Sequence, residues 1–225
     1  MMCKMSVLLT VYNGAEFLEE QLDSIRLQTR APDEVLISDD GSIDGSQAFI
    51  SSYLARHDLG RTWFFHQNTV NLGYSENFIS TALRASGDVL VFCDQDDVWT
   101  TEKVETLARY YDTHPDAHAV ISTFVVIDGN GKRADTLFTR LRSRPGGSGP
   151  ISFTQQLRGN YSVGFALSAR KDFYRRLVPL IREKRLDFDV PVGLFAAMEN
   201  GYHIVRTPLV RRRVHAGNVS GPMYT

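Results

Sequence analysis

The fold is decided by the stretch Val89-Leu90-Val91-Phe92-Cys93-Asp94-Gln95-Asp96-Asp97-Val98-Trp99 of this 225-residue chain. Its five apolar residues, 89–93, predict a strand buried on both faces, as in a parallel sheet. Three carboxylates follow within four positions, although clustered like charges repel one another and resist desolvation. Hard carboxylate oxygens suit Mg²⁺ or Mn²⁺, which also bridges to phosphate oxygens. The alternative is a solvated acidic turn that caps a helix starting near Thr100.

Composition is typical of a globular protein. Hydrophobic residues make up 43% of the chain, enough for a real core, and its length suits one large domain. No run approaches the roughly 18 apolar residues of a membrane span, and the N-terminus lacks the apolar region of a signal peptide. Two cysteines, Cys3 and Cys93, do not make a disulfide framework. We therefore expect a cytoplasmic protein.

The net charge of −1 conceals a strong asymmetry between the two halves. Residues 1–118 carry 19 acids and 8 bases, giving −11, whereas residues 119–225 carry 7 acids and 17 bases, giving +10. An acidic half can hold a metal ion, and a basic half can meet a phosphate or an anionic surface. The alternative is that the two halves neutralise each other in the fold.

Short apolar runs alternate with helical patterns along the first 127 residues. We expect strands at 6–12, 34–38, 62–66, 88–93 and 119–127. We expect amphipathic helices between them at 16–28, 46–57, 75–85 and 102–113. This alternation predicts an α/β fold whose mostly parallel central sheet is flanked by helices. Ligands of such sheets bind outside the carboxyl ends of the strands.

The pattern changes after residue 127. We expect helices at 153–157, 171–183 and 190–200, and strands at 163–168 and 203–207. Segments 140–150 and 211–220 are basic, and we expect both to be loops. No linker separates two domains, so we expect a single domain over 1–225 with halves at 1–127 and 128–225.

Polar residues that favour turns follow three of the predicted strands. The first strand ends in Thr10-Val11-Tyr12-Asn13-Gly14, the second in Asp39-Asp40-Gly41-Ser42, and the fourth in Asp94-Gln95-Asp96-Asp97. Because the carboxyl ends of parallel strands meet at one edge of the sheet, these residues should lie together. The sequence therefore predicts a ligand site at that edge.

These motifs, taken in order, carry a resemblance to a known family. They are Ser6-Val7-Leu8-Leu9-Thr10-Val11-Tyr12-Asn13-Gly14, the stretch 34–46, Asn71-Leu72-Gly73-Tyr74-Ser75-Glu76-Asn77-Phe78, and Asp94-Gln95-Asp96-Asp97. Together they resemble the family 2 inverting glycosyltransferases with the GT-A fold, clearly over residues 5–110 and in patches to residue 220. The form Asp-Gln-Asp-Asp-Val-Trp, with His215-Ala216-Gly217-Asn218, is most similar to the bacterial rhamnosyltransferase-like branch.

The resemblance makes 1–127 the nucleotide-sugar-binding half and 128–225 the acceptor-binding half. It implies that Tyr12 stacks on a pyrimidine base, while Asp40 rather than Asp39 accepts the N3–H of uracil or thymine. The alternative for these two aspartates is capping the helix that follows Ser42.

Within the acidic turn, the resemblance implies that Asp94 lies on the ribose side of the donor and that Asp96 binds the metal. Asp97 is either a residue behind the metal ligands or a helix N-cap. The remaining donor-binding residues implied by the resemblance are Thr10, Asn13, Asn77 and Gln95.

The second half should supply the proton acceptor that an inverting transfer needs. In the family this base is an acid that precedes a helix, a position held here by Leu186-Asp187-Phe188-Asp189. Asp189 is favoured and Asp187 stays open, because the chain departs from the family's commoner Glu-Asp or His-Asp pair. His215 and Arg213 resemble the family's closing loop, which implies that His215 completes the metal shell and that Arg213 neutralises phosphate charge. The alternative is a surface loop whose charge is incidental.

The resemblance implies an enzyme that moves a sugar from a UDP- or dTDP-sugar to a saccharide or lipid-linked saccharide, in bacterial surface polysaccharide synthesis. Mg²⁺ or Mn²⁺ is the expected cofactor, and nucleic acid is not an expected partner. Peripheral association with the inner membrane, at its cytoplasmic face, and a homodimer are further expectations. The alternatives are a nucleotidyltransferase, which usually has a cation in its first loop where 10–14 has none, and a non-catalytic nucleotide-sugar-binding protein.

Overall fold

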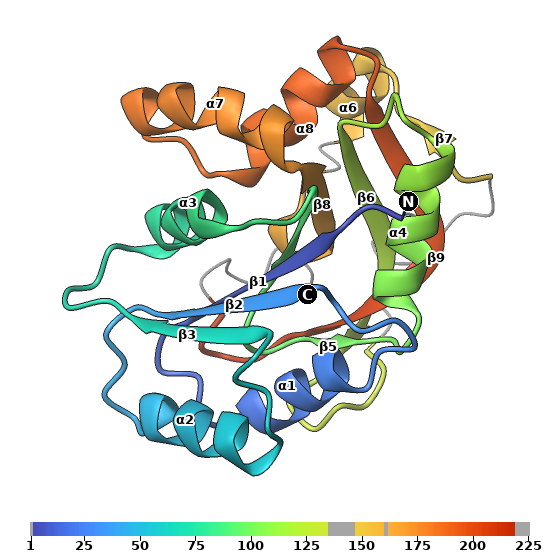
Figure 1. The fold of residues 1–225 in the computed structure, drawn as a ribbon. Coiled ribbons are helices and arrows are strands. Elements are labelled where there is room, and N and C mark those ends of the chain that lie inside the picture. Colours follow the sequence, from blue (N-terminus) through green and yellow to red (C-terminus); the bar gives the residue numbers. More distant parts are fainter. Residues whose placement is uncertain (1, 135–146, 160–161, 219–225) are drawn as a thin grey trace.

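The computed structural model describes residues 2–134, 147–159 and 162–218 (Figure 1). Its first part contains the expected alternation of strands and helices. The elements are β1 (Met5–Val11), α1 (Leu18–Arg26), β2 (Glu34–Asp39), α2 (Ser46–Arg56), β3 (Trp63–Gln67), α3 (Tyr74–Arg84) and β4 (Val89–Cys93). Every residue of β1 and of β4 is buried, so the prediction of strands covered on both faces is confirmed.

The second part contains two long strands, β6 and β9, several short strands and further helices. Its elements are β5 (Val98–Trp99), α4 (Lys103–Thr113), β6 (Ala119–Ile127), β7 (Gly149–Pro150), α6 (Phe153–Gly159), the 3₁₀ turn η1 (Gly164–Ala166), β8 (Leu167–Arg170), α7 (Lys171–Lys184), α8 (Asp189–Met198) and β9 (Tyr202–Arg213).

One mixed sheet connects both parts, with the strand order β3-β2-β1-β4-β8-β6-β9-β5 and with β7 paired to β9. The first four strands pair in parallel, as the sequence predicts. In contrast, β8 is antiparallel to both of its neighbours, β4 and β6, and the short strand β5 is antiparallel to β9. The carboxyl ends of β1, β2 and β4 therefore meet at one edge, where the sequence places its candidate site.

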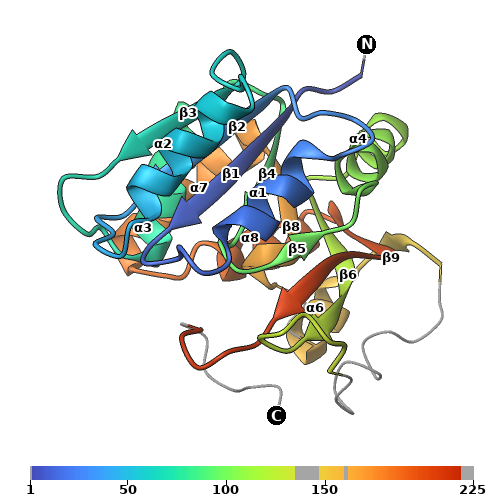
Figure 2. The ribbon, with the colours of Figure 1, turned by 90° about the horizontal axis from the view of Figure 1, so that it is seen from below.

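Helices cover both faces of the sheet. In Figure 1, α1 and α2 lie below it, and α3, α7 and α8 lie above it. Figure 2, seen from below, shows α1 and α2 in front of the strands. This double cover removes water from both faces and explains the continuous apolar runs of the central strands. No helix among the described residues is both long and apolar enough to cross a membrane.

Two expectations for the second part are wrong in detail. The strand expected at 163–168 begins only at Leu167, because the chain first makes the turn η1, where the backbone N–H of Gly164 donates to Asp189. The segment expected to be a loop from 211 continues β9 to Arg213, because its arginines find buried hydrogen-bond acceptors. Most of the segment 140–150 and residues 219–220 lie outside the described residues; Gly149–Pro150 form β7.

Candidate active site

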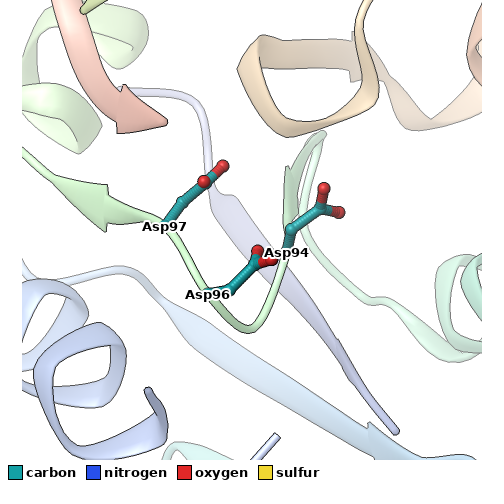
Figure 3. Close-up of side chains that lie close together, drawn as sticks. All are labelled: Asp94, Asp96 and Asp97. Carbon is teal, nitrogen blue, oxygen red and sulfur yellow. The ribbon is translucent and has the colours of Figure 1, made fainter. Parts of the chain in front are cut away.

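The candidate site is built on the turn that joins β4 to β5. This turn carries Asp94, Asp96 and Asp97, and ligand oxygens of the three carboxylates lie within 4.8 Å of one another (Figure 3). Asp96 and Asp97 are buried, and Asp94 is partly buried. The predicted carboxylate cluster is therefore present at the end of the predicted strand, and its oxygens are close enough together to share one divalent cation.

Two buried oxygens of this cluster have no hydrogen-bond partner within the described residues, namely Oδ1 of Asp94 and Oδ2 of Asp97. Burial raises the pKa of both carboxyls above its usual range, and for Asp94 the charges of Asp97 and Asp96 raise it further. A buried acceptor without a partner is costly, and a cation removes that cost. The three acids therefore fit the metal ion that the sequence predicts.

Arg212 is the arginine that faces the acids. Its Nη1 lies 3.3 Å from Oδ1 of Asp97 and 3.6 Å from Oδ1 of Asp96, and its guanidinium stacks over the Phe165 ring at 4.9 Å. Burial lowers the pKa of Arg212, but the charge of Asp97 and the other acids outweighs it, so the net shift is upward. Arg212 thus provides fixed positive charge beside the carboxylate turn.

Arg213 has a different environment from the one expected for a residue that neutralises phosphate. Its backbone N–H donates to Oδ1 of Asp97 at 2.9 Å, which ties β9 to the turn. Its guanidinium is buried and donates to the carbonyls of Asp96 and Gly129 and to the Glu20 carboxylate. These contacts hold α1, the turn at 128–131 and β9 together, and Arg212 takes the place facing the acids.

The chain after β9 closes onto Asp96. Nε2 of His215 lies 2.9 Å from Oδ2 of Asp96, and Nδ2 of Asn218 donates to the same oxygen at 2.7 Å. The His215 ring packs against Phe17 with a centroid distance of 4.6 Å. The structure thus brings His215 to Asp96, the residue predicted to bind the metal.

The first strand ends in a turn that presents Tyr12 to solvent. Tyr12 is 51% exposed, and the amide of Gln95 holds its backbone: Oε1 accepts from the N–H at 2.7 Å, and Nε2 donates to the carbonyl at 3.0 Å. Asn13 has a φ of 49°, and its Oδ1 accepts from the backbone N–H of Ile43. Gln95 therefore positions Tyr12, while the tyrosine ring is the exposed group.

The two aspartates after β2 have separate environments. Oδ1 of Asp39 accepts from the backbone N–H groups of Gly41 and Ser42, which is a turn-forming role. Both oxygens of Asp40 bind the segment 68–73 instead, through donors of Asn68, Leu72 and Gly73. Since a carboxylate offers about four acceptor positions, one position on Asp40 is left after these three bonds.

Two further residues expected to bind the donor lie beneath this surface. Asn77 is 2% exposed, and its Oδ1 accepts from Ser38 at 2.7 Å and from Asn68 at 3.0 Å. Thr10 is buried and lies opposite Ser38 in the β1–β2 pairing. Asn77 therefore joins α3 to β2 and to the segment that Asp40 holds.

The candidate base lies on the opposite side of the acidic turn. Asp189 is the first residue of α8 and is partly buried, whereas Asp187 is exposed. Burial raises the pKa of Asp189 to about 6, and the charge of Asp187 adds to this, although the Gly164 N–H opposes it. The charge of Asp189 in turn raises the pKa of Asp94. A carboxylate with a pKa near 6 can accept a proton at neutral pH.

Three residues at this site carry no local signal in the sequence. Arg212 is buried beside the acids, and Lys103 lies fully buried with its Nζ 3.8 Å from the centre of the Trp99 ring. Burial lowers the pKa of Lys103 to about 7, against the opposing charges of Cys93, Asp97 and Asp94. Tyr74 begins α3 and faces both Asp94 and Asp189. Only the tertiary fold brings these side chains to the acids.

Residues 6–177 match the model of the family described as Glycosyl transferase family 2. An uncharacterized glycosyltransferase of Nostoc sp. is 31% identical over 137 residues, which are 61% of this chain and 41% of that protein. Abequosyltransferase RfbV of Salmonella typhimurium is 31% identical over 115 residues, which are 50% of this chain and 34% of that protein. The chain spans less than half the length of these curated relatives.

Among solved structures, residues 1–349 of TarS from S. aureus, in complex with UDP, align with a TM-score of 0.69 at 18% identity. The alignment covers 94% of this chain and 60% of that chain. The same part of TarS in complex with UDP-GlcNAc aligns with a TM-score of 0.70. This likeness confirms the predicted α/β fold with a central sheet flanked by helices.

Proposed function

We propose, from the premise that this chain belongs to glycosyl transferase family 2, that it transfers a sugar from a UDP- or dTDP-sugar to an acceptor hydroxyl with inversion. The observation that supports the proposal is a cluster of acids at the end of β4 together with a separate acid at the start of α8. Buried oxygens of Asp94 and Asp97 in the turn have no partner among the described residues, and burial raises the pKa of the Asp189 carboxyl to about 6. One side suits a metal-bound diphosphate and the other suits a proton acceptor.

On the donor side, Asp96 and His215 would hold Mg²⁺ or Mn²⁺, with Asp94 toward the ribose. The metal ion would stabilise the charge of the departing nucleoside diphosphate. Arg212, whose charge is held in place by Asp97 and the Phe165 ring, is the residue that we assign to neutralising phosphate, in place of Arg213.

The nucleotide base would lie against the exposed ring of Tyr12, with Asp40 accepting the N3–H of uracil or thymine through its remaining acceptor position. Thr10 and Asn13 complete the turn beneath the base. We assign Gln95 and Asn77 to positioning, because Gln95 is bound to the backbone of Tyr12 and Asn77 is buried. UDP bound to the structurally similar TarS supports a uridine nucleotide as the first donor to try.

On the acceptor side, Asp189 would remove the proton from the attacking hydroxyl. Its oxygen attacks the anomeric carbon from the face opposite the leaving diphosphate, so the new bond has inverted configuration. Asp187, two residues earlier and exposed, is the alternative base.

The acceptor is proposed to be a saccharide or a lipid-linked saccharide of bacterial surface polysaccharide synthesis. The +10 charge of residues 119–225 suits a pyrophosphate-linked lipid at the cytoplasmic face of the membrane. The likeness to abequosyltransferase RfbV and the Asp-Gln-Asp-Asp-Val-Trp form support a hexosyl- or rhamnosyltransferase of this kind. Flotation with vesicles of anionic lipid tests the membrane part, and a protein that stays at the bottom would refute it.

The donor assignment is tested by thermal denaturation with UDP-, dTDP- and GDP-sugars, each with and without Mn²⁺. We expect stabilisation by a UDP- or dTDP-sugar only when Mn²⁺ is present, because the diphosphate and the acids share the metal. No stabilisation by any of them would refute the assignment. Binding without transfer to any acceptor would favour a non-catalytic nucleotide-sugar-binding protein instead.

A further inference from the structure

Tyr74 is packed between aromatic rings next to the candidate base, and no predicted role accounts for it. It is the first residue of α3, after Gly73, whose φ of 83° turns the chain into the helix. The centre of its ring lies 5.2 Å from that of Phe78, in an edge-on contact, and 5.5 Å from that of Phe188, in a tilted contact. A tyrosine fixed on two sides by aromatic rings loses little further freedom when its hydroxyl binds a ligand.

The hydroxyl of Tyr74 lies beside Gly164, whose backbone N–H is bonded to the candidate general base Asp189. It lies 2.7 Å from the position that a Cβ on Gly164 would occupy, and Cζ of Phe188 lies 2.8 Å from the same point. The N–H of Gly164 donates to Asp189, so the tyrosine hydroxyl and the base both contact one residue. Only glycine leaves room for this arrangement.

Charged groups of both half-sites also act on the Tyr74 hydroxyl. Packing around it raises its pKa well above the ordinary value, and the charges of Asp94 and Asp189 add to this. The hydroxyl therefore stays protonated and can donate a hydrogen bond. No hydrogen bond of this hydroxyl to another described residue exists, although 36% of the residue surface is open to solvent.

We propose that the Tyr74 hydroxyl binds a hydroxyl group of a sugar at the reacting centre and thereby contributes to sugar specificity. The inference rests on the proposed glycosyl transfer. Its geometric basis is a hydroxyl that lies beside Gly164 and Phe188, next to the candidate base, and has no hydrogen-bond partner among the described residues. The charges of Asp94, on the donor side, and of Asp189, on the acceptor side, both act on it. A sugar hydroxyl both donates and accepts hydrogen bonds, so it matches the phenol and the neighbouring carboxylates together.

The test compares Tyr74→Phe with Tyr174→Phe. Both substitutions remove one tyrosine hydroxyl from the same aromatic cluster, in which the Tyr174 ring packs on Phe92 at 5.3 Å. The hydroxyl of Tyr174 is also without a partner, but the residue is fully buried and cannot reach a substrate. The control therefore reports the effect of losing a hydroxyl from the packing alone.

Binding of UDP, dTDP and a panel of their hexose conjugates is measured by titration calorimetry with Mn²⁺. If the contact is to the donor sugar, Tyr74→Phe weakens binding of the preferred nucleotide sugar about 2- to 10-fold and leaves binding of the bare nucleotide unchanged. If the contact is to the acceptor, donor binding is unchanged. In that case KM for p-nitrophenyl hexoside acceptors rises by a similar factor, while hydrolysis of the donor by water keeps its rate.

Equal donor binding and equal acceptor KM in Tyr74→Phe and the wild type would overturn the inference, as would the same losses in Tyr174→Phe. If the wild-type chain binds no nucleotide sugar, the proposed function itself fails. If the wild type binds one and Tyr74→Phe matches it throughout, only the role of Tyr74 fails.

Discussion

Asp189→Asn should remove transfer and at the same time stabilise the fold. Burial raises the pKa of the Asp189 carboxyl to about 6 from its ordinary value, so the folded chain resists its ionisation. At about 1.4 kcal/mol per pKa unit, holding the charge at pH 8 costs up to about 3 kcal/mol. Asparagine has the same shape, carries no charge and can still accept from the Gly164 N–H.

The sign of the pH dependence follows from the raised pKa. The cost is absent below about pH 3, where the carboxyl is protonated in both the folded and the unfolded chain. It grows as the pH rises toward about 6 and is constant above that. Asp189→Asn should therefore raise Tm by several degrees at pH 8 and leave it unchanged near pH 3.

The activity should change in the opposite direction. Removing a general base lowers kcat by about 10²- to 10⁴-fold, whereas binding of the nucleotide sugar should stay as in the wild type. In the wild type, kcat/KM should fall about tenfold per pH unit below about pH 6. Asp187→Asn is the matched control: it removes the charge of an exposed side chain that adds only the second-largest effect to the pKa of Asp189, so kcat should stay near the wild-type value and Tm at pH 8 should rise much less than in Asp189→Asn. Full activity of Asp189→Asn, or a lower Tm at pH 8, would refute the reasoning.

Three further substitutions test the remaining parts of the site. Asp96→Asn removes an expected metal ligand and should weaken Mn²⁺ binding at least about tenfold in calorimetry; unchanged Mn²⁺ affinity would move the metal away from this turn. Tyr12→Leu removes a stacking surface and should weaken UDP binding by about 1–3 kcal/mol without lowering Tm, since the ring is 51% exposed. Phe64→Leu, at a similarly exposed aromatic residue of β3, is its control, and equal losses in the two would contradict stacking. Phe188→Ala removes a fully buried ring that packs on Phe92 at 4.7 Å and should lower the free energy of unfolding by about 3–5 kcal/mol in urea titration. It should also lower kcat more than donor affinity, because Phe188 precedes Asp189; an unchanged kcat would show that the ring does not position the base.

The first half of the fold was predictable because its signals are local. The apolar run 89–93 is long enough to show burial on both faces, and the acids that follow it are adjacent in the chain. Strand order then brings Tyr12 and Asp40 to the same edge, since parallel strands align their carboxyl ends. The acidic cluster and the order of the first helices and strands are therefore confirmed.

The choice between Arg212 and Arg213 was not predictable, because it depends on strand register. Adjacent residues of a strand point to opposite faces, so the sequence alone leaves the arginine that faces the acids undetermined. β9 pairs with β6, which places Arg212 opposite Val126 and Arg213 opposite Ile127, and the register of this pairing shifts twice between residues 122 and 124. Such shifts interrupt the two-residue period of a strand, so the pattern of the sequence does not show which arginine faces the acids.

The acidic residues 1–118 and the basic residues 119–225 are joined by ion pairs. The two halves do neutralise each other in part, since Arg212 pairs with Asp97, Arg213 with Glu20 and Arg182 with Glu76. Each of these pairs joins the basic half to the acidic half, so their charges contribute to holding the halves together. Yet buried oxygens on Asp94 and Asp97 keep no hydrogen-bond partner in the described part of the chain. Charge pairing between the halves thus extends into the turn where a metal-bound diphosphate is proposed to bind, but it leaves these two oxygens without a partner there, and a ligand that binds them would stabilise the folded chain.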